Sequence, residues 1–244
     1  MTSGPDPLPG ADGSARTAPA VPAPAPPAPS PASAPAASAL PVFLSTEHWS
    51  LLGTRSMTWS EVMSRIQIHL TVLSAFLVVL ALTAQATGFG TPFRVLAIGF
   101  ASAALVMGTL TAVRVNAASL EDADLVRSMN RIRHAYVDLV PELAPYLTAG
   151  THDDDAGLMH TYALGRRRNT ALHVVGSTGV FLMAVNTLVA GTLGALVADA
   201  SGAGTALTVV VGVVTALLYA LSQLEMGRRT FTTERDVRFP TGAG

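Results

Sequence analysis

The sequence predicts an all-α, polytopic membrane protein with four spans, arranged as two transmembrane helical hairpins joined by a cytoplasmic helical connector. Two observations support this expectation. The mean hydropathy of the 244-residue chain is +0.44 and only 13% of its residues are charged, which is too apolar for a soluble domain of this size. Its longest apolar runs form two pairs, and a polar segment at residues 114–168 separates one pair from the other.

Composition also excludes several classes of function. The chain has no Cys, which rules out disulfides, thiolate zinc sites and cysteine nucleophiles. Its formal net charge of -1 argues against nucleic acid as a partner, because binding to phosphates requires a basic surface. The chain has no Lys, and a lysine-free, alanine-rich chain is typical of a GC-rich genome such as that of an actinobacterium.

Residues 1–44 are expected to form a disordered tail. Residues 1–41 hold twelve of the 16 prolines and show no apolar periodicity, so they cannot bury enough surface to offset chain entropy. We interpret the tail as a spacer of polyproline II character, and a ligand for a proline-binding module is the alternative.

Residues 45–65 are expected to form an interfacial amphipathic segment. Ser45 can cap a short stretch in which Trp49 brings apolar surface into the headgroup region. Farther along, Thr58-Trp59-Ser60-Glu61 matches a capping box, which predicts that a helix begins near Trp59 and continues into the first span. The two tryptophans would then flank the entry to the membrane.

The first transmembrane hairpin is predicted at residues 66–113. No charged residue occurs in this range before Arg94, and a helix needs about 20 apolar residues to cross the hydrocarbon core. Spans are expected at 66–87 and 93–113, joined by a tight turn that contains two glycines and Pro92. Small residues recur every four positions in the second span, which predicts close helix packing: they are Ala104, Gly108 and Ala112.

The cytoplasmic connector is predicted at residues 114–169. Its apolar residues have helical spacing, while charged residues such as Asp122 and Arg127 occupy the other faces. No Gly or Pro occurs from Thr109 to Val140, so the second span is expected to continue as one helix until Pro141 and Pro145 end it. A polar loop at 148–157 and a short helix up to Arg168 should follow.

The second hairpin is predicted at residues 170–224, with spans at 170–198 and 204–224 and a short glycine-containing turn between them. Small residues in its first span again predict close packing: they are Ala190, Gly191, Gly194, Ala195 and Ala198. The tail at 225–244 is polar and is expected to be a short helix followed by coil.

The distribution of Arg predicts the orientation. Residues 1–65 carry three Arg, 114–168 carry seven and 225–244 carry four, whereas the two hairpin turns carry only Arg94. Basic residues near span ends stay in the cytoplasm, so both termini and the connector should lie on the cytoplasmic side of the inner membrane.

One cluster suggests chemistry, the acidic loop at residues 152–155 together with His160. Imidazole and carboxylate groups bind divalent cations such as Mg²⁺ or Mn²⁺, which predicts a metal site; its residues would be His152, Asp153, Asp154, Asp155 and His160. The spacing matches no defined motif. The alternative is that the three Asp residues cap the helix that follows. They would accept hydrogen bonds from its free N–H groups. No other cofactor is expected.

Few polar residues lie inside the predicted spans. His69 and His173 fall at similar depth and could face each other, and Asn186 should find an interhelical hydrogen bond because an unpaired amide in hydrocarbon is unfavourable. Apart from Arg94 at the margin of the second span, no Asp, Glu or Arg lies in the spans to carry a proton or an ion, which disfavours a transporter.

Three sequence runs carry a resemblance that covers about residues 45 to 240. They are residues 47–59 (EHWSLLGTRSMTW), 129–136 (MNRIRHAY) and 152–157 (HDDDAG). With them the chain resembles uncharacterised four-span integral membrane proteins of actinobacteria, a resemblance that implies the fold and brings no activity. The architecture of membrane hairpins beside cytoplasmic helices is also similar to that of SLATT-type effectors of bacterial defence systems, without a shared motif.

Three functions follow as hypotheses. The first is a non-enzymatic membrane scaffold, surrounded by the lipid bilayer, whose connector binds a cytoplasmic protein partner or a second copy of the chain. The second is a membrane-disrupting effector or pore that responds to a cytoplasmic signal. The third is a metal-dependent membrane enzyme that uses the acidic loop and His160.

Overall fold

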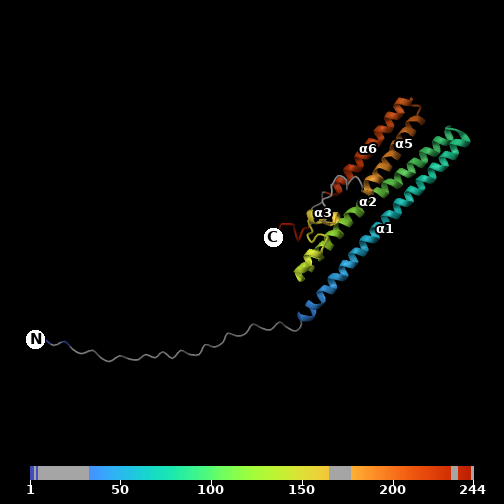
Figure 1. The fold of residues 1–244 in the computed structure, drawn as a ribbon. Coiled ribbons are helices and arrows are strands. Elements are labelled where there is room, and N and C mark those ends of the chain that lie inside the picture. Colours follow the sequence, from blue (N-terminus) through green and yellow to red (C-terminus); the bar gives the residue numbers. More distant parts are fainter. Residues whose placement is uncertain (3, 5–32, 165–176, 232–235, 243–244) are drawn as a thin grey trace. The chain divides into compact units, whose positions relative to one another are not determined.

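Helices account for nearly all of the computed structural model, which describes residues 1, 2, 4, 33–164, 177–231 and 236–242 (Figure 1). This described part of the chain contains no β-strand. Residues 1–40 and 41–244 are separate compact units, and every contact discussed below lies within the second. The elements, in order, are α1 (Ser33–Thr87), α2 (Thr91–Leu139), the 3₁₀ helix η1 (Pro141–Tyr146), α3 (Asp155–Ala163), α5 (Thr178–Ala200) and α6 (Thr205–Phe231).

Four of these helices, α1, α2, α5 and α6, are long and apolar enough to cross a membrane, as predicted. In the most apolar window of each helix, no more than 22% of the residues are buried. Large aliphatic side chains therefore lie on the outer surface of all four helices; examples are Leu77, Leu110, Leu188 and Leu218. Surface of this kind is suited to lipid and not to water, which indicates a multi-pass membrane protein.

Helices α1 and α2 lie side by side and run in opposite directions. The chain reverses at Gly88, whose φ of +67° is in the left-handed region that glycine tolerates, and Pro92 lies in the first turn of α2. Near the turn, Phe76 stacks on Phe100 with ring centroids 4.3 Å apart. Far from the turn, a carboxylate oxygen of Glu61 lies 2.9 Å from a guanidinium nitrogen of Arg114.

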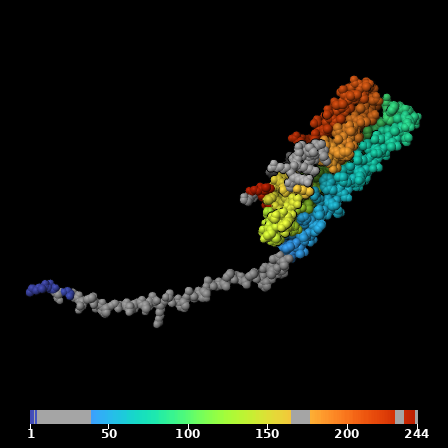
Figure 2. Space-filling view, viewed as in Figure 1, coloured from blue at the N-terminus to red at the C-terminus, as the bar shows by residue number. Residues whose placement is uncertain are grey.

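Helix α5 uses two different faces for its two neighbours. One face meets α2 at Gly108, where a Cβ atom would lie only 2.7 Å from Cγ of Asn186. The other meets α6 at Gly191, where a Cβ atom would lie 3.1 Å from the carbonyl oxygen of Gly212. Helix α5, in orange, lies against the α1–α2 pair (Figure 2). Farther toward the turn, a cavity of about 260 Å³ lies between the three helices, beside Phe76, Phe100 and Val189. The predicted close packing of small residues is confirmed at Gly108 and Gly191.

Helix α2 bears out the prediction of one helix that runs on from the second span. It continues without interruption from Thr91 to Leu139, and Val140 leaves the helical conformation immediately before Pro141. Proline disfavours a helical residue before it, which accounts for the end of α2 and for the separate 3₁₀ turn that follows.

The predicted start of a helix near Trp59 is wrong. Helix α1 is continuous through this region, and the members of the expected capping box lie in its interior. Glu61 pairs with Arg65 and Arg114, and the hydroxyl of Ser45 donates to the carbonyl of Val42 one turn earlier. A helix that continues directly into a span cannot also lie flat in the headgroup layer, so an interfacial segment at 45–65 is not present as a separate element (Figure 1).

The predicted disorder of residues 1–44 falls mainly outside the described residues. In the described part of this tail, α1 already begins at Ser33, so the boundary at residue 44 is wrong. The tail at 225–244 begins as part of α6 and includes the non-helical residues 236–242, as predicted.

Candidate functional site

The polar ends of the helices form what we call the polar module: α1 from His48 to Trp59, α2 beyond Arg114, η1, α3 and residues 236–242. Its apolar centre joins three helices, with Ala123, Val126 and Met129 from α2, Leu158 and Tyr162 from α3 and Leu51 from α1. Apolar positions at helical spacing along α2 thus pack against α3 and α1. This packing holds α3, and the acidic loop that precedes it, against α2.

Asp122 is the residue at which α1, α2 and α3 meet. Its side chain is only 4% exposed. It accepts hydrogen bonds from Nε of Arg55 at 2.6 Å, from Nε1 of Trp59 at 2.7 Å and from the hydroxyl of Tyr162 at 2.6 Å. Burial and the hydrogen bond to Asp122 raise the pKa of Tyr162 above its usual range, so the phenol remains a donor. The prediction that Asp122 occupies a polar face of α2 is wrong.

Asn130 attaches the acidic loop to α2. The side chain is completely buried, and its amide nitrogen donates to the carbonyl oxygens of His152 at 2.8 Å and Gly157 at 3.2 Å. Its amide oxygen accepts from the hydroxyl of Thr161 at 2.9 Å. A buried amide with partners on all these sides fixes the loop in one position, because each lost bond would leave a polar group unpaired.

The three aspartates of the acidic loop have three different roles. Asp154 is the N-cap of α3 and accepts from the backbone N–H of Gly157 at 2.8 Å, which confirms the predicted alternative of helix capping for this one of the three aspartates. Asp155 lies in the first turn of α3 and pairs with Arg127 at 2.7 Å. Asp153 is fully buried and accepts from Nε of Arg131 at 2.6 Å.

Asp153 and Asp154 also bind residues 236–242, which we call the C-terminal strap. The Asp153 carboxylate accepts from the backbone N–H groups of Arg238 at 3.0 Å and Phe239 at 2.8 Å, and Asp154 accepts from that of Thr241 at 2.5 Å. Burial opposes the charge of Asp153, but these hydrogen bonds and Arg131 outweigh burial and lower its pKa below the usual range. The carboxylates are therefore held ionised against the strap.

The sequence did not predict these contacts, because the strap lies more than 80 residues beyond the acidic loop in the chain. The only signal in the sequence is the unusual density of acidic residues in the loop.

The metal-site prediction gains no support from this arrangement. Among the described residues, no three His, Asp or Glu side chains converge as a group that could hold a metal ion. Both oxygens of Asp153 already accept hydrogen bonds from donors that a metal would have to displace. A divalent cation at His152, Asp153, Asp154, Asp155 and His160 stays a prediction.

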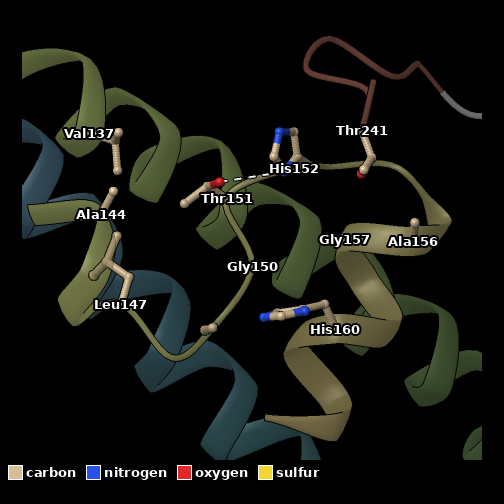
Figure 3. A pocket seen from close by; sticks show the side chains of 11 residues that line it. Val137, Ala144, Leu147, Gly150, Thr151, His152, Ala156, Gly157, His160 and Thr241 are labelled. Carbon is tan, nitrogen blue, oxygen red and sulfur yellow. Dashed lines mark hydrogen bonds between the residues drawn. The ribbon is translucent and has the colours of Figure 1, made fainter. Parts of the chain in front are cut away.

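A cavity of about 350 Å³ lies between η1, the acidic loop and α3. Its wall includes apolar groups from η1 and α2, the rings of His152 and His160, and Thr241 of the strap (Figure 3). His160 extends from α3 toward the loop that precedes the acidic loop, whereas the ring of His152 lies beyond that loop, near the strap (Figure 3).

Two polar residues predicted inside the spans are buried in the helix packing. His69 is 1% exposed and Asn186 is fully buried. Their side chains interact across α1 and α5, but among the described residues neither makes a hydrogen bond of full geometry. The interhelical hydrogen bond of Asn186 therefore stays a prediction. His173 and the basic run 166–168 lie outside the described residues.

Comparison with known proteins adds nothing to this geometry. The resemblance to actinobacterial four-span proteins and the similarity to SLATT-type effectors therefore remain expectations from the sequence. No protein-family model, no curated protein and no solved structure matches the chain, so its function must be inferred from its own residues.

Proposed function

We propose that the chain is a multi-pass protein of the inner membrane, built from two hairpins, whose polar module is a cytoplasmic docking site for a partner protein. The four apolar helices and the excess of Arg in the module support this orientation. An ion pair supports the hairpin arrangement, because Arg94 at the start of α2 lies 3.1 Å from Asp199 at the end of α5. The two turns then share one end of the helices, and the polar module lies at the other.

The observation that carries the docking proposal is a surface that we call the apolar ridge. It consists of the last residue of α2, the residue that follows it and two residues of η1, all outside the predicted spans. Its side chains are exposed by 45%, 44%, 37% and 82%: they are Leu139, Val140, Leu143 and Tyr146. Adjacent large apolar groups in water are typical of a protein interface, and Tyr is enriched at such interfaces.

Buried hydrogen bonds hold the rest of the polar module, which carries the apolar ridge, in one arrangement. Buried side chains such as Asp122 and Asn130 have their hydrogen-bonding groups paired within the module. Networks of this kind hold a surface in one conformation, and a preformed surface loses less entropy on association. Since these polar groups serve the module itself, we propose a non-enzymatic scaffold rather than a catalyst.

Site-specific crosslinking in intact cells of the source organism tests this proposal. A photoreactive phenylalanine analogue in place of Tyr146 is expected to give a discrete adduct larger than the chain, because the side chain would lie inside the interface. The same analogue at Met159, which is 39% exposed on α3, is the matched control and should give no such adduct. An additional Leu143→Arg substitution should remove the Tyr146 adduct.

The mass of the adduct identifies the partner class. An adduct with the mass of two chains would replace the cytoplasmic partner by a second copy of this protein. Equal labelling at both positions, or none at Tyr146, would contradict the docking proposal.

A further inference from the structure

We propose that the acidic loop and the adjacent face of α2 form a recognition site for a short, bent peptide segment, with the chain's own C-terminal strap as its reversible ligand in cis. The site is separate from the apolar ridge, and the proposal does not depend on the docking function.

Backbone groups make most of the contacts between the strap and its site. The Asp153 carboxylate binds two consecutive N–H groups, those of Arg238 and Phe239, and the backbone N–H of Asp153 donates to the carbonyl of Phe239 at 3.2 Å. At the start of the strap, Arg131 donates to the carbonyl of Asp236 at 2.5 Å. The strap is therefore held mainly through its own main chain, by side chains of the site and by one backbone N–H, that of Asp153.

Two side chains of the strap make contacts that would let the site select among peptides. The Phe239 ring stacks on His134 of α2, with centroids 4.2 Å apart and an interplanar angle of 28°. The hydroxyl of Thr241 donates to Asp154 at 2.9 Å. The ligand class is therefore a bent segment in which an aromatic residue is followed, two positions later, by a hydroxyl residue.

The site remains built without the strap, which is why we infer a ligand rather than a part of the core. Asn130 holds the loop, Asp154 caps α3 through Gly157, and Arg131 pairs with Asp153, all inside the module. The strap itself is exposed along most of its length, and only Phe239 among residues 236–240 is partly covered. Its release would leave the loop in place and would expose the charged Asp153 to water.

Release of the strap would also open the cavity. Thr241 of the strap forms part of the cavity wall beside His152, and His160 lines the same cavity (Figure 3). The strap thus borders both the cavity and the peptide site.

Distance measurement between two spin labels tests the proposal on the full chain. Val237→Cys in the strap and Met159→Cys in α3 give unique labelling sites, because the protein has no Cys of its own, and both positions are exposed. The labelled protein is expected to give one narrow distance distribution. An excess of the blocked heptapeptide Asp-Val-Arg-Phe-Pro-Thr-Gly, which copies residues 236–242, should broaden it by displacing the strap.

Three variants make this test specific. Phe239→Ala should broaden the distribution without peptide, and the heptapeptide with Ala in place of Phe should compete about tenfold more weakly, because the stacking contact is lost. Asp153→Asn should also release the strap. Asp155→Asn is the matched control and should leave the distribution narrow, since Asp155 pairs with Arg127 of α2.

Two results would overturn the proposal. A broad distribution in the unmodified labelled chain would mean that the strap is not a ligand of the loop. A narrow distribution that neither the heptapeptide nor Phe239→Ala changes would mean that the strap is a permanent part of the fold.

Discussion

Gly108 and Asn186 show how one small residue sets the distance between α2 and α5. Asn186 is fully buried and its carboxamide occupies the space where a Cβ at residue 108 would lie. Gly108→Ala is expected to destabilise the protein by about 1 to 3 kcal/mol, because a close-packed interface cannot absorb the added methyl group without a shift. The midpoint of unfolding in mixed detergent micelles measures this change.

Two further variants separate this clash from a general effect of glycine. Gly99 is also in α2, and a Cβ there would meet nothing within 4 Å, so Gly99→Ala should be neutral or stabilise by up to about 1 kcal/mol. In an Asn186→Ala background, Gly108→Ala should lose most of its effect, since the atoms that it strikes are gone. Equal destabilisation by both glycine substitutions would contradict the close contact.

At the candidate site, residues near each other in the chain were predictable and distant partners were not. Asp154 precedes a helix by one position, and this local relation was sufficient to predict its capping role. Asp122 and Asp153 depend on partners far away, such as Arg55 and Phe239. A single sequence carries no local signal for such pairs, because a charged residue on an amphipathic helix is more often solvated than buried.

Among the elements, α1 is the helix whose start was predicted wrongly from a local capping signal. A capping box predicts a helix start, but α1 passes through it, and the contacts of Arg55 and Trp59 with Asp122 hold this part of α1 along α2. Capping signals are weak preferences of about 1 kcal/mol, so several tertiary contacts can override them. The result is a helix that continues from the first span into the polar module.

A proline substitution distinguishes the continuous α1 from a helix that begins at Trp59. Met57 is 74% exposed and lies in the interior of α1, whereas it would precede the cap in the predicted scheme. Met57→Pro is therefore expected to destabilise the protein by about 3 kcal/mol, as proline does inside a helix.

Thermal unfolding in detergent measures this effect, with Met57→Ala as the control that removes the side chain and keeps the backbone. If Met57→Pro matched Met57→Ala, α1 would not be continuous at this position.

For the whole molecule, the orientation in the membrane is the expectation that most needs a measurement. Single-cysteine variants are straightforward because the chain has no Cys. Ser201→Cys lies in the turn between α5 and α6, and Glu142→Cys lies in η1, and both side chains are exposed. With a membrane-impermeant maleimide, Ser201→Cys should label in intact spheroplasts, while Glu142→Cys should label only after permeabilisation, because Arg retains the module in the cytoplasm.

Labelling in the reverse order would place the polar module outside the cytoplasm and would remove the proposed cytoplasmic partner. Labelling of both positions in intact cells would contradict the placement of the turns and the module on opposite sides. Either pattern would leave the strap proposal standing, since it concerns contacts inside the module.

The sequence by itself determined the helical class, the four apolar segments, the tight turns, the end of α2 at Pro141 and the cap of α3. These features depend on hydrophobic length and on residues close together in the chain, which a sequence displays directly. Only the tertiary structure decided that α1 is continuous, that Asp122 is buried at a three-helix junction, and that the strap lies on the acidic loop. These features depend on contacts between distant residues, whose free energies outweigh local preferences.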